Sequence, residues 1–295
     1  FKITDQTPEH QLYEDVDYQK FWAGLQQQKL DELERILITR MVGLPAARLM
    51  DAGCGYGRLF PCYQEGVDEV VLLDSSHSLL KQAKENTFHR ATYVSSDISR
   101  IPLQDATFDR ILLIRVLHHL PDPAAIFREL SRLLIPGGHL IFTYCNKKNL
   151  ERVFRWLLAR NPYHPFKREP STVWERFFMH HPDYIHEELN KAGLQIHDIR
   201  GAGVLDKIAG KLGKLGEGFP LGVGLAPFFG RSALAPWIFC DAVKIGDRAI
   251  LNPTPLMDLF QCPNCGNKLI RLTDGFACSH CGKVYQESDG ILDFQ

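Results

Sequence analysis

Two groups of residues in this 295-residue chain have the types and spacing that binding chemistry needs. The first is the segment "RLMDAGCGYGRLF" at 48–60, in which Gly53, Gly55 and Gly57 follow a short apolar run. Because glycine lacks a Cβ atom, such a loop lets the backbone close around a ligand. The second group is a pair of C-x2-C motifs near the end of the chain, whose thiols have the spacing of metal ligands.

Acidic residues around the glycine loop indicate what it binds. The spacing G-x-G-x-G differs from the G-x-G-x-x-G of dinucleotide enzymes. Asp51, just before the loop, would repel a pyrophosphate but suits an ammonium group. Asp74 ends the next apolar run, where its carboxylate can accept hydrogen bonds from ribose hydroxyls, and Asp97 ends the following one, where an adenine amino group can donate to it. Ammonium, ribose and adenine together describe S-adenosylmethionine.

The elements that must position these residues alternate along the chain. Apolar runs such as "EVVLLD" and "FDRILLI" are separated by helical patterns such as "SHSLLKQAKEN". This rhythm predicts an α/β fold with a Rossmann-like, doubly wound and mostly parallel sheet of seven strands, which binds ligands at the carboxyl ends of its strands. We expect this domain over 45–248. The segment 1–44 is predicted to be helical and to pack on it, because its apolar residues recur three and four positions apart.

Four segments in order resemble the motifs of class I S-adenosylmethionine-dependent methyltransferases: "LMDAGCGYG", "VVLLDSS", "SSDISRIPLQDATFDRILLIRVLHHLPDP" and "LLIPGGHLIFT". The resemblance covers residues 45–145 and implies an enzyme that transfers the cofactor's methyl group to an acceptor. The cofactor-binding residues that it implies are Asp51, Gly53, Gly55 and Gly57 at the methionine portion, Asp74 at the ribose with Ser75 beside it, Asp97 and Ile98 at the adenine, and Arg115 near the cofactor's carboxylate or the acceptor.

His118 and His119 follow the fourth predicted strand and face the expected acceptor pocket. Methyl transfer is a direct displacement, so the enzyme mainly aligns donor and acceptor, and a general base is needed only if the acceptor must lose a proton. One of the two histidines is a candidate for that base, the alternative being a helical turn in which both only cap and pack. The surrounding "IRVLHHL" looks more like methyltransferases that act on small-molecule or lipid-like acceptors.

The composition limits which binding partners and which cellular compartment we expect for this protein. The formal net charge of −1 gives no global basic field, so nucleic acid is a disfavoured partner. Scattered cysteines and the lack of a visible signal sequence favour the cytoplasm. The glycine-rich segment 201–235 has two interpretations. It is either a lid over the acceptor pocket or, through the basic and apolar stretch 205–230, a peripheral membrane contact.

The second group of chemical residues predicts a zinc ribbon over 257–295. Cys262 and Cys265 are separated by twelve residues from Cys278 and Cys281, and four thiolates leave zinc no open position for catalysis. The zinc would therefore be structural, and because so short a segment lacks a sufficient core, metal binding would supply its folding energy. Disulfide bonds are the alternative.

The tail "CGKVYQESDGILDF" resembles the small zinc-ribbon partners that activate tRNA and release-factor methyltransferases. This resemblance implies an alternative function, methylation of RNA or protein in the translation machinery with the ribbon positioning the substrate. A basic face that joins the ribbon to Arg152, Arg155, Arg160, Lys167 and Arg168 would support it. A third hypothesis is a sensor or scaffold that binds the cofactor without catalysis.

Overall fold

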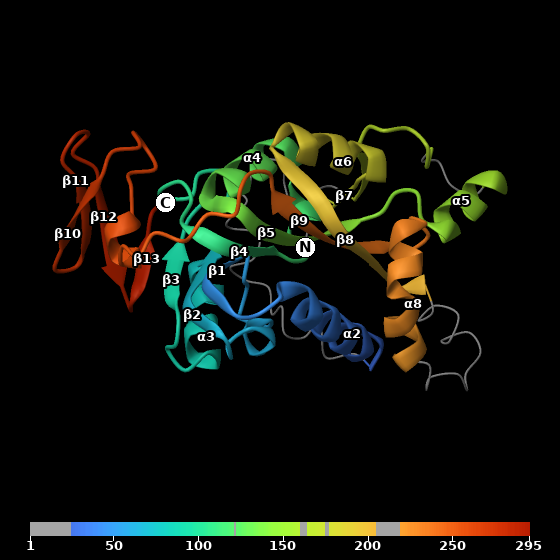
Figure 1. Ribbon diagram of the computed structural model, residues 1–295, viewed down its shortest axis with the longest axis horizontal. Helices are drawn as coiled ribbons and strands as arrows, with labels where there is room; N and C mark the ends of the chain where they lie inside the picture. Colours follow the sequence, from blue (N-terminus) through green and yellow to red (C-terminus); the bar gives the residue numbers. More distant parts are fainter. Residues whose placement is uncertain (1–24, 121, 160–163, 175–176, 205–218) are drawn as a thin grey trace.

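The computed structural model describes residues 25–120, 122–159, 164–174, 177–204 and 219–295. Its main sheet has eleven strands in the order β10-β11-β12-β13-β3-β2-β1-β4-β5-β9-β8 (Figure 1). In chain order these are β1 Ala46–Ala52, β2 Val67–Asp74, β3 Thr92–Ser95, β4 Phe108–Leu113, β5 Leu134–Cys145, β8 Leu194–Ala202, β9 Trp237–Lys244, β10 Leu269–Leu272, β11 Gly275–Cys278, β12 Val284–Ser288 and β13 Ile291–Asp293. A separate two-stranded sheet pairs β6 Ser171–Trp174 with β7 Phe177–Met179.

Helices cover both faces of the sheet (Figure 1). In the described part of the chain these are α2 Leu25–Val42, α3 His77–Asn86, α4 Pro123–Leu133, α6 Pro182–Lys191 and α8 Phe219–Arg231, while α5 Leu150–Leu157 lies away from the sheet at one end of the molecule. Helices α4 and α6 contribute to the buried cluster on one face, whereas α2 and α3 contribute to the cluster on the other. Of the segment 1–44 that was predicted to be helical, residues 1–24 lie outside the described residues, and α2 buries Leu33, Leu37 and Met41 against the core.

Seven neighbouring strands of the main sheet, in the order β3-β2-β1-β4-β5-β9-β8, form the predicted doubly wound sheet. Strands β3, β2, β1, β4 and β5 are parallel, and β9 runs antiparallel to both β5 and β8. The buried, near-continuous apolar sequence of β1 fits a strand covered on both sides. The chain leaves β1 toward β2 on one side and returns to β4 on the other, which makes the carboxyl ends of β1 and β4 the switch point where ligands bind in such sheets.

The C-terminal ribbon continues the main sheet, which the sequence did not predict. Strand β13 pairs in parallel with β3, Leu292 lying opposite Val94. The backbone N–H of Phe294 donates to the Ser95 carbonyl at 2.8 Å, and Phe276 and Phe294 belong to the same buried cluster as the central strands. Because β3 would otherwise be an exposed edge strand, the ribbon satisfies its backbone groups and covers it.

The described parts of the glycine-rich segment 201–235 include the end of β8 and the helix α8. Helix α8 packs on β8, and a Cβ atom added at Gly230 would lie 2.7 Å from the Arg200 backbone, so glycine permits the close approach. Of the stretch 205–230, for which a membrane contact was one interpretation, residues 205–218 lie outside the described residues. Within the described chain, no helix is both long and apolar enough to cross a membrane.

Candidate functional site

The glycine loop lies at the carboxyl end of β1. Gly53, Gly55 and Gly57 all have positive φ angles, of 74°, 55° and 76°. A Cβ atom at Gly53 would lie 2.3 Å from Cγ2 of Val116, whereas one at Gly55 would meet nothing within 4 Å. Gly53 is therefore required for contact with the turn that follows β4, and Gly55 borders open space that a ligand can occupy.

Asp74 connects the end of β2 to this loop. Its Oδ2 accepts a hydrogen bond from the Gly55 N–H at 2.8 Å, and its Oδ1 accepts one from the Ser76 N–H at 2.9 Å. The carboxylate is only partly buried, and each oxygen has further lone pairs for ribose hydroxyls. The neighbouring Ser75 has its carbonyl oxygen 2.5 Å from the side-chain amide of Gln295, at the end of the ribbon.

The predicted adenine site follows β3. Asp97 is exposed, and its Oδ1 accepts a hydrogen bond from the Ser99 N–H at 2.7 Å, so this side chain also stabilises a turn. Ile98 is partly buried and packs against the core cluster. The structure thus places both residues at the same edge of the sheet as Asp74, where the strands β2 and β3 end.

Asp51 is the buried member of the predicted site. It is 2% exposed, and its Oδ2 accepts a hydrogen bond from the Tyr63 hydroxyl at 2.7 Å. Burial raises the pKa of Asp51 to about 6, although the Tyr63 hydrogen bond and the nearby Arg58 act in the opposite direction. A cationic ligand would stabilise the ionised form of this buried carboxyl group. The ammonium group of S-adenosylmethionine is such a cation.

This pKa predicts a pH-dependent affinity for S-adenosylmethionine. An ammonium group binds the Asp51 carboxylate and not the neutral acid, so affinity should fall up to about tenfold per pH unit below pH 6 and level off above it. Tyr63→Phe removes a hydrogen bond that lowers this pKa and should move the midpoint to higher pH. Calorimetric titrations between pH 5 and 8 measure both effects, and an unchanged midpoint in Tyr63→Phe would exclude Asp51 as the titrating group.

Arg115 occupies a place that its sequence position did not reveal. It forms an ion pair with Glu34 of α2, and its guanidinium lies 3.5 Å over the Trp237 ring. Glu34 is fully buried and also pairs with Arg58, which follows the glycine loop, at 2.9 Å. The N-terminal helix therefore contributes a buried carboxylate that links the glycine loop to the turn after β4.

His118 and His119 lie in a 3₁₀ turn after β4, and both belong to an aromatic cluster. The His118 ring lies 3.9 Å from His119, 4.6 Å from Phe177 and 5.2 Å from Trp237, measured between ring centroids. His118 is 5% exposed, and among the described residues its Nδ1 has no hydrogen-bond partner. Burial holds the pKa of His118 well below its usual range, so its imidazole is neutral.

Two more histidines lie near this cluster, at the start of α6. His181 caps α6, accepting a hydrogen bond from the Asp183 N–H at 3.2 Å. His180 is instead fully buried close to His118, and burial lowers its pKa to about 4. Neutral imidazoles and aromatic rings are thus buried together at this edge of the sheet.

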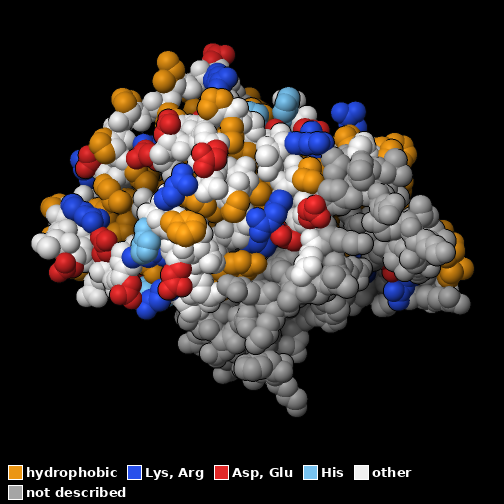
Figure 2. Space-filling model, turned by 90° about the horizontal axis from the view of Figure 1, so that it is seen from below, with side chains coloured by type: hydrophobic (Ala, Val, Ile, Leu, Met, Phe, Trp, Pro, Cys, Tyr) orange, Lys and Arg blue, Asp and Glu red, His pale blue; other side chains and the backbone are white. Residues whose placement is uncertain are grey.

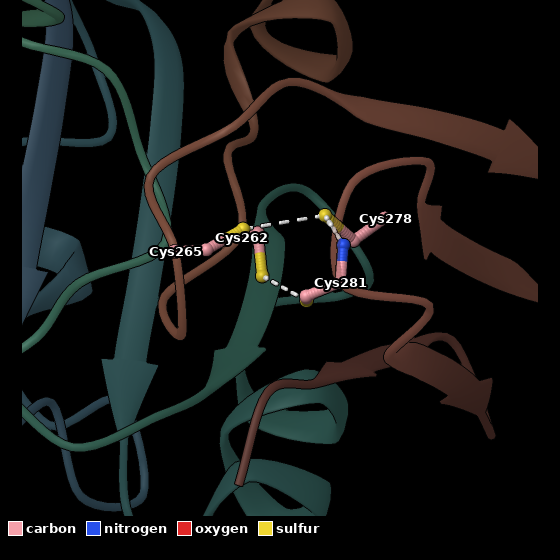
Figure 3. A group of neighbouring side chains, drawn as sticks. All are labelled: Cys262, Cys265, Cys278 and Cys281. Carbon is pink, nitrogen blue, oxygen red and sulfur yellow. Dashed lines mark hydrogen bonds between the residues drawn. The ribbon is translucent and has the colours of Figure 1, made fainter.

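The four cysteines of the ribbon converge as predicted (Figure 3). Their sulfur atoms all lie within 4.8 Å of one another, with Cys262 and Cys281 3.6 Å apart and Cys265 and Cys278 3.5 Å apart. Zinc–sulfur bonds of 2.3 Å in a tetrahedron put thiolates about 3.8 Å apart, so the arrangement fits a zinc ion. The pKa of Cys281 is lowered to about 6, mainly because its sulfur accepts a hydrogen bond from the backbone N–H of Lys283.

Comparison with known proteins supports this picture. Residues 50–142 match a family described as "Methyltransferase domain". A ubiquinone biosynthesis O-methyltransferase of Xanthomonas campestris is 31% identical over 114 residues, which are 37% of this chain and 48% of that protein. The chain thus spans about half the length of the first curated relatives it matches.

Two solved structures share the fold. One is the magnesium protoporphyrin IX methyltransferase of Synechocystis PCC 6803 with bound SAH, at 16% identity and a TM-score of 0.53, covering 77% of this chain and 92% of that one. The other comes from a complex between the Haloferax volcanii Trm112 methyltransferase activator and a methyltransferase, at 16% identity and a TM-score of 0.54, covering 78% and 99%. The chain therefore has the Rossmann-like fold of class I methyltransferases, with a four-cysteine cluster at its C-terminus.

Proposed function

We propose that this protein transfers a methyl group from S-adenosylmethionine to an oxygen of a small, largely apolar acceptor. The observation that carries the proposal is the placement of the buried His118, with its unpartnered Nδ1, in an aromatic cluster at the same sheet edge as the glycine loop. The curated relatives named as O-methyltransferases support oxygen as the acceptor atom and a small molecule as the acceptor class.

The residues at the carboxyl edge fit the cofactor. Gly55 leaves the space that the methionine portion needs, Asp51 offers a buried carboxylate to its ammonium group, and Asp74 presents acceptors to its ribose. When bound, S-adenosylmethionine supplies a sulfonium-activated methyl group, whose bond to sulfur breaks as the bond to the acceptor oxygen forms. Asp97 and Ile98, which follow β3 at the same edge, would contact the adenine.

The chain's own residues would align the acceptor and remove its proton. Trp237 and Phe177 offer apolar ring faces that exclude water and hold a flat acceptor. The Nδ1 of His118 is buried without a partner among the described residues, so an acceptor that displaced the rings covering it would reach this atom and transfer its hydroxyl proton there as the oxygen attacks the methyl group. Arg115, held between Glu34 and Trp237, places a positive charge beside this position.

Substitution of His118 tests this assignment. His118→Asn should lower kcat by about 10²- to 10⁴-fold, because the general base is lost, while the Kd for S-adenosylmethionine changes little. His119→Asn is the matched control on the same turn and should retain most of the activity. Transfer of labelled methyl groups to a panel of phenols and hydroquinones measures the rates. Equal losses in the two variants would assign both histidines to packing instead.

A translation-related acceptor is the second candidate, supported by the structural likeness to a protein from a Trm112 complex. A basic face continuous with the ribbon would support this candidate. Its described members, Arg152, Arg155, Lys167 and Arg168, belong to α5 and the segment beside it, and α5 lies at the opposite end of the molecule from the ribbon (Figure 1). Arg160 lies outside the described residues. On the face in Figure 2, positive and negative side chains alternate among the coloured residues without forming a basic stripe. Methylation of total RNA or ribosomal protein, without transfer to small phenols, would favour this candidate.

We also propose that the four cysteines bind one structural zinc ion. The support is the distance between the sulfurs and the conformation of Gly266 and Gly282, whose positive φ angles of 73° and 72° follow the two cysteine pairs. Cys281 is additionally placed so that its backbone N–H donates to the Cys278 sulfur at 3.5 Å. Such N–H donors stabilise thiolates and therefore favour a metal over free thiols.

A further inference from the structure

Helix α5 carries an apolar stripe that nothing described in the chain covers. Leu150, Phe154, Leu157 and Leu158 recur at helical spacing and are 50%, 60%, 66% and 47% exposed, and none of the helix residues is buried. An amphipathic helix in a globular protein normally turns such a stripe toward the core. Four large apolar side chains exposed on one helix therefore mark an interaction surface.

The helix is fixed to the body of the protein at its first turn. The Asn149 side chain caps it, accepting a hydrogen bond from the Arg152 N–H at 3.1 Å and donating to the Asn146 carbonyl at 2.7 Å. The Leu150 N–H donates to the Leu234 carbonyl, just beyond α8, at 3.1 Å. The stripe is thus presented in a defined orientation at one end of the molecule (Figure 1).

Basic side chains accompany the stripe. Arg152 and Arg155 lie on the opposite face of the helix, with Glu151 as its acidic residue. On one flank, Trp156 meets Phe166 edge to face with ring centroids 5.7 Å apart, and Phe166 is itself 46% exposed. Two exposed basic residues, Lys167 and Arg168, follow directly. Arg155 pairs with Glu151 at 3.7 Å and Arg168 with Glu187 at 3.6 Å, both at the surface, while Lys167 and Arg152 add further positive charge. An apolar face of Leu and Phe with arginines opposite is the pattern of helices that lie in a membrane interface.

We propose that α5 docks this protein onto the surface of an anionic lipid bilayer, with its four apolar side chains at the boundary of the acyl chains. Charge complementarity favours this occupant, because basic residues near an apolar face are attracted to anionic headgroups. A helix at the end of the molecule can also lie flat on a surface (Figure 1). This surface differs from the predicted contact through 205–230, and the inference does not depend on the proposed function.

Docking in this orientation has a consequence for access to the site. Helix α5 follows the carboxyl end of β5. Because β5 is parallel to β4, this end lies at the same edge of the sheet as the glycine loop and the His118 cluster. Phe228, in the last turn of α8, is 60% exposed at the same end of the molecule. The bilayer would therefore lie beside the acceptor side of the protein, where an apolar molecule can enter from the lipid.

Co-sedimentation of the full chain with vesicles tests the inference. We expect binding to vesicles of mixed phosphatidylcholine and phosphatidylglycerol, and much weaker binding to phosphatidylcholine alone. The double variant Phe154→Glu/Leu157→Glu should weaken binding at least about tenfold, because two apolar contacts are lost. The matched control is Ile270→Glu/Val284→Glu, which changes two similarly exposed residues of the ribbon, 55% and 56%, and should bind as the original chain does.

Three results would overturn the inference. The first is a lack of binding by the original chain to phosphatidylglycerol vesicles at low salt, and the second is an equal loss of binding in both double variants. The third is a concentration-dependent dimer, seen by light scattering without lipid and abolished only in Phe154→Glu/Leu157→Glu. That dimer would show that a second copy of the chain covers the stripe. Circular dichroism of each variant verifies that it is folded.

Discussion

Removal of the metal from the four-cysteine site is expected to lower the melting temperature of the whole chain by about 10 °C or more. The ribbon is part of the main sheet, because β13 pairs with β3, and Phe260, Phe276 and Phe294 stack within the cluster that contains the central strands. Without the metal, β3 would become an exposed edge and the stacked rings would lose their cover.

The cysteine variant and its control separate the metal from the rest of the ribbon. Cys262→Ser removes a buried ligand and should reproduce the effect of chelation, with loss of one metal ion per chain in elemental analysis. His280 lies between the second pair of cysteines but does not belong to the four-residue cluster. The control variant His280→Ala should therefore keep both the metal and the melting temperature. A metal-free protein with an unchanged melting temperature would show that the ribbon folds without zinc.

Gly53→Ala is expected to destabilise the protein by about 2–5 kcal/mol. The new Cβ atom would lie 2.3 Å from Cγ2 of Val116, and the residue has a positive φ angle of 74°. The left-handed conformation costs about 1–2 kcal/mol for a residue with a Cβ atom, and overpacking adds about 1–3 kcal/mol. Because the clash pushes the glycine loop away from the turn that holds His118, methyl transfer should fall as well.

Two further variants isolate the steric part of this effect. Gly193→Ala has a similar φ of 73° with nothing within 4 Å of the new Cβ atom, so it should incur only the conformational cost. Val116→Ala in the Gly53→Ala background should recover part of the loss, giving a coupling free energy of at least about 1 kcal/mol. Urea unfolding measures these variants together with the original chain and Val116→Ala alone, which the coupling free energy requires. If Gly53→Ala costs no more than Gly193→Ala, the close contact does not constrain the loop.

Local signals account for the features that the sequence predicted well. The period of the apolar runs predicted the seven-stranded sheet, since burial on both faces imposes continuous apolar strands. The glycine loop and the cysteine pairs are likewise short motifs, whose spacing sets the backbone conformation of the loop and brings the four sulfurs together. Asp51 and Asp74 could be placed because strand ends of a parallel sheet meet at one edge.

Contacts between residues far apart in the chain could not be predicted from the sequence pattern. Glu34 pairs with Arg115, 81 positions away, and nothing in a helical stripe distinguishes this buried glutamate from an exposed one. The pairing of β13 with β3 joins segments about two hundred residues apart, and only the tertiary fold brings their edges together. Helix α8 formed despite its glycines and Pro227, because close packing on β8 outweighs low helix propensity.

The most direct test of the central claim is a calorimetric titration of the metal-loaded protein with S-adenosylmethionine. We expect micromolar binding that weakens about 100-fold in Asp74→Ala, because the charged acceptor for the ribose hydroxyls is lost. Asp68→Ala, an exposed aspartate at the other end of the same strand, should bind as the original chain does. A folded protein that does not bind, or binding that survives in Asp74→Ala, would contradict the proposed cofactor site.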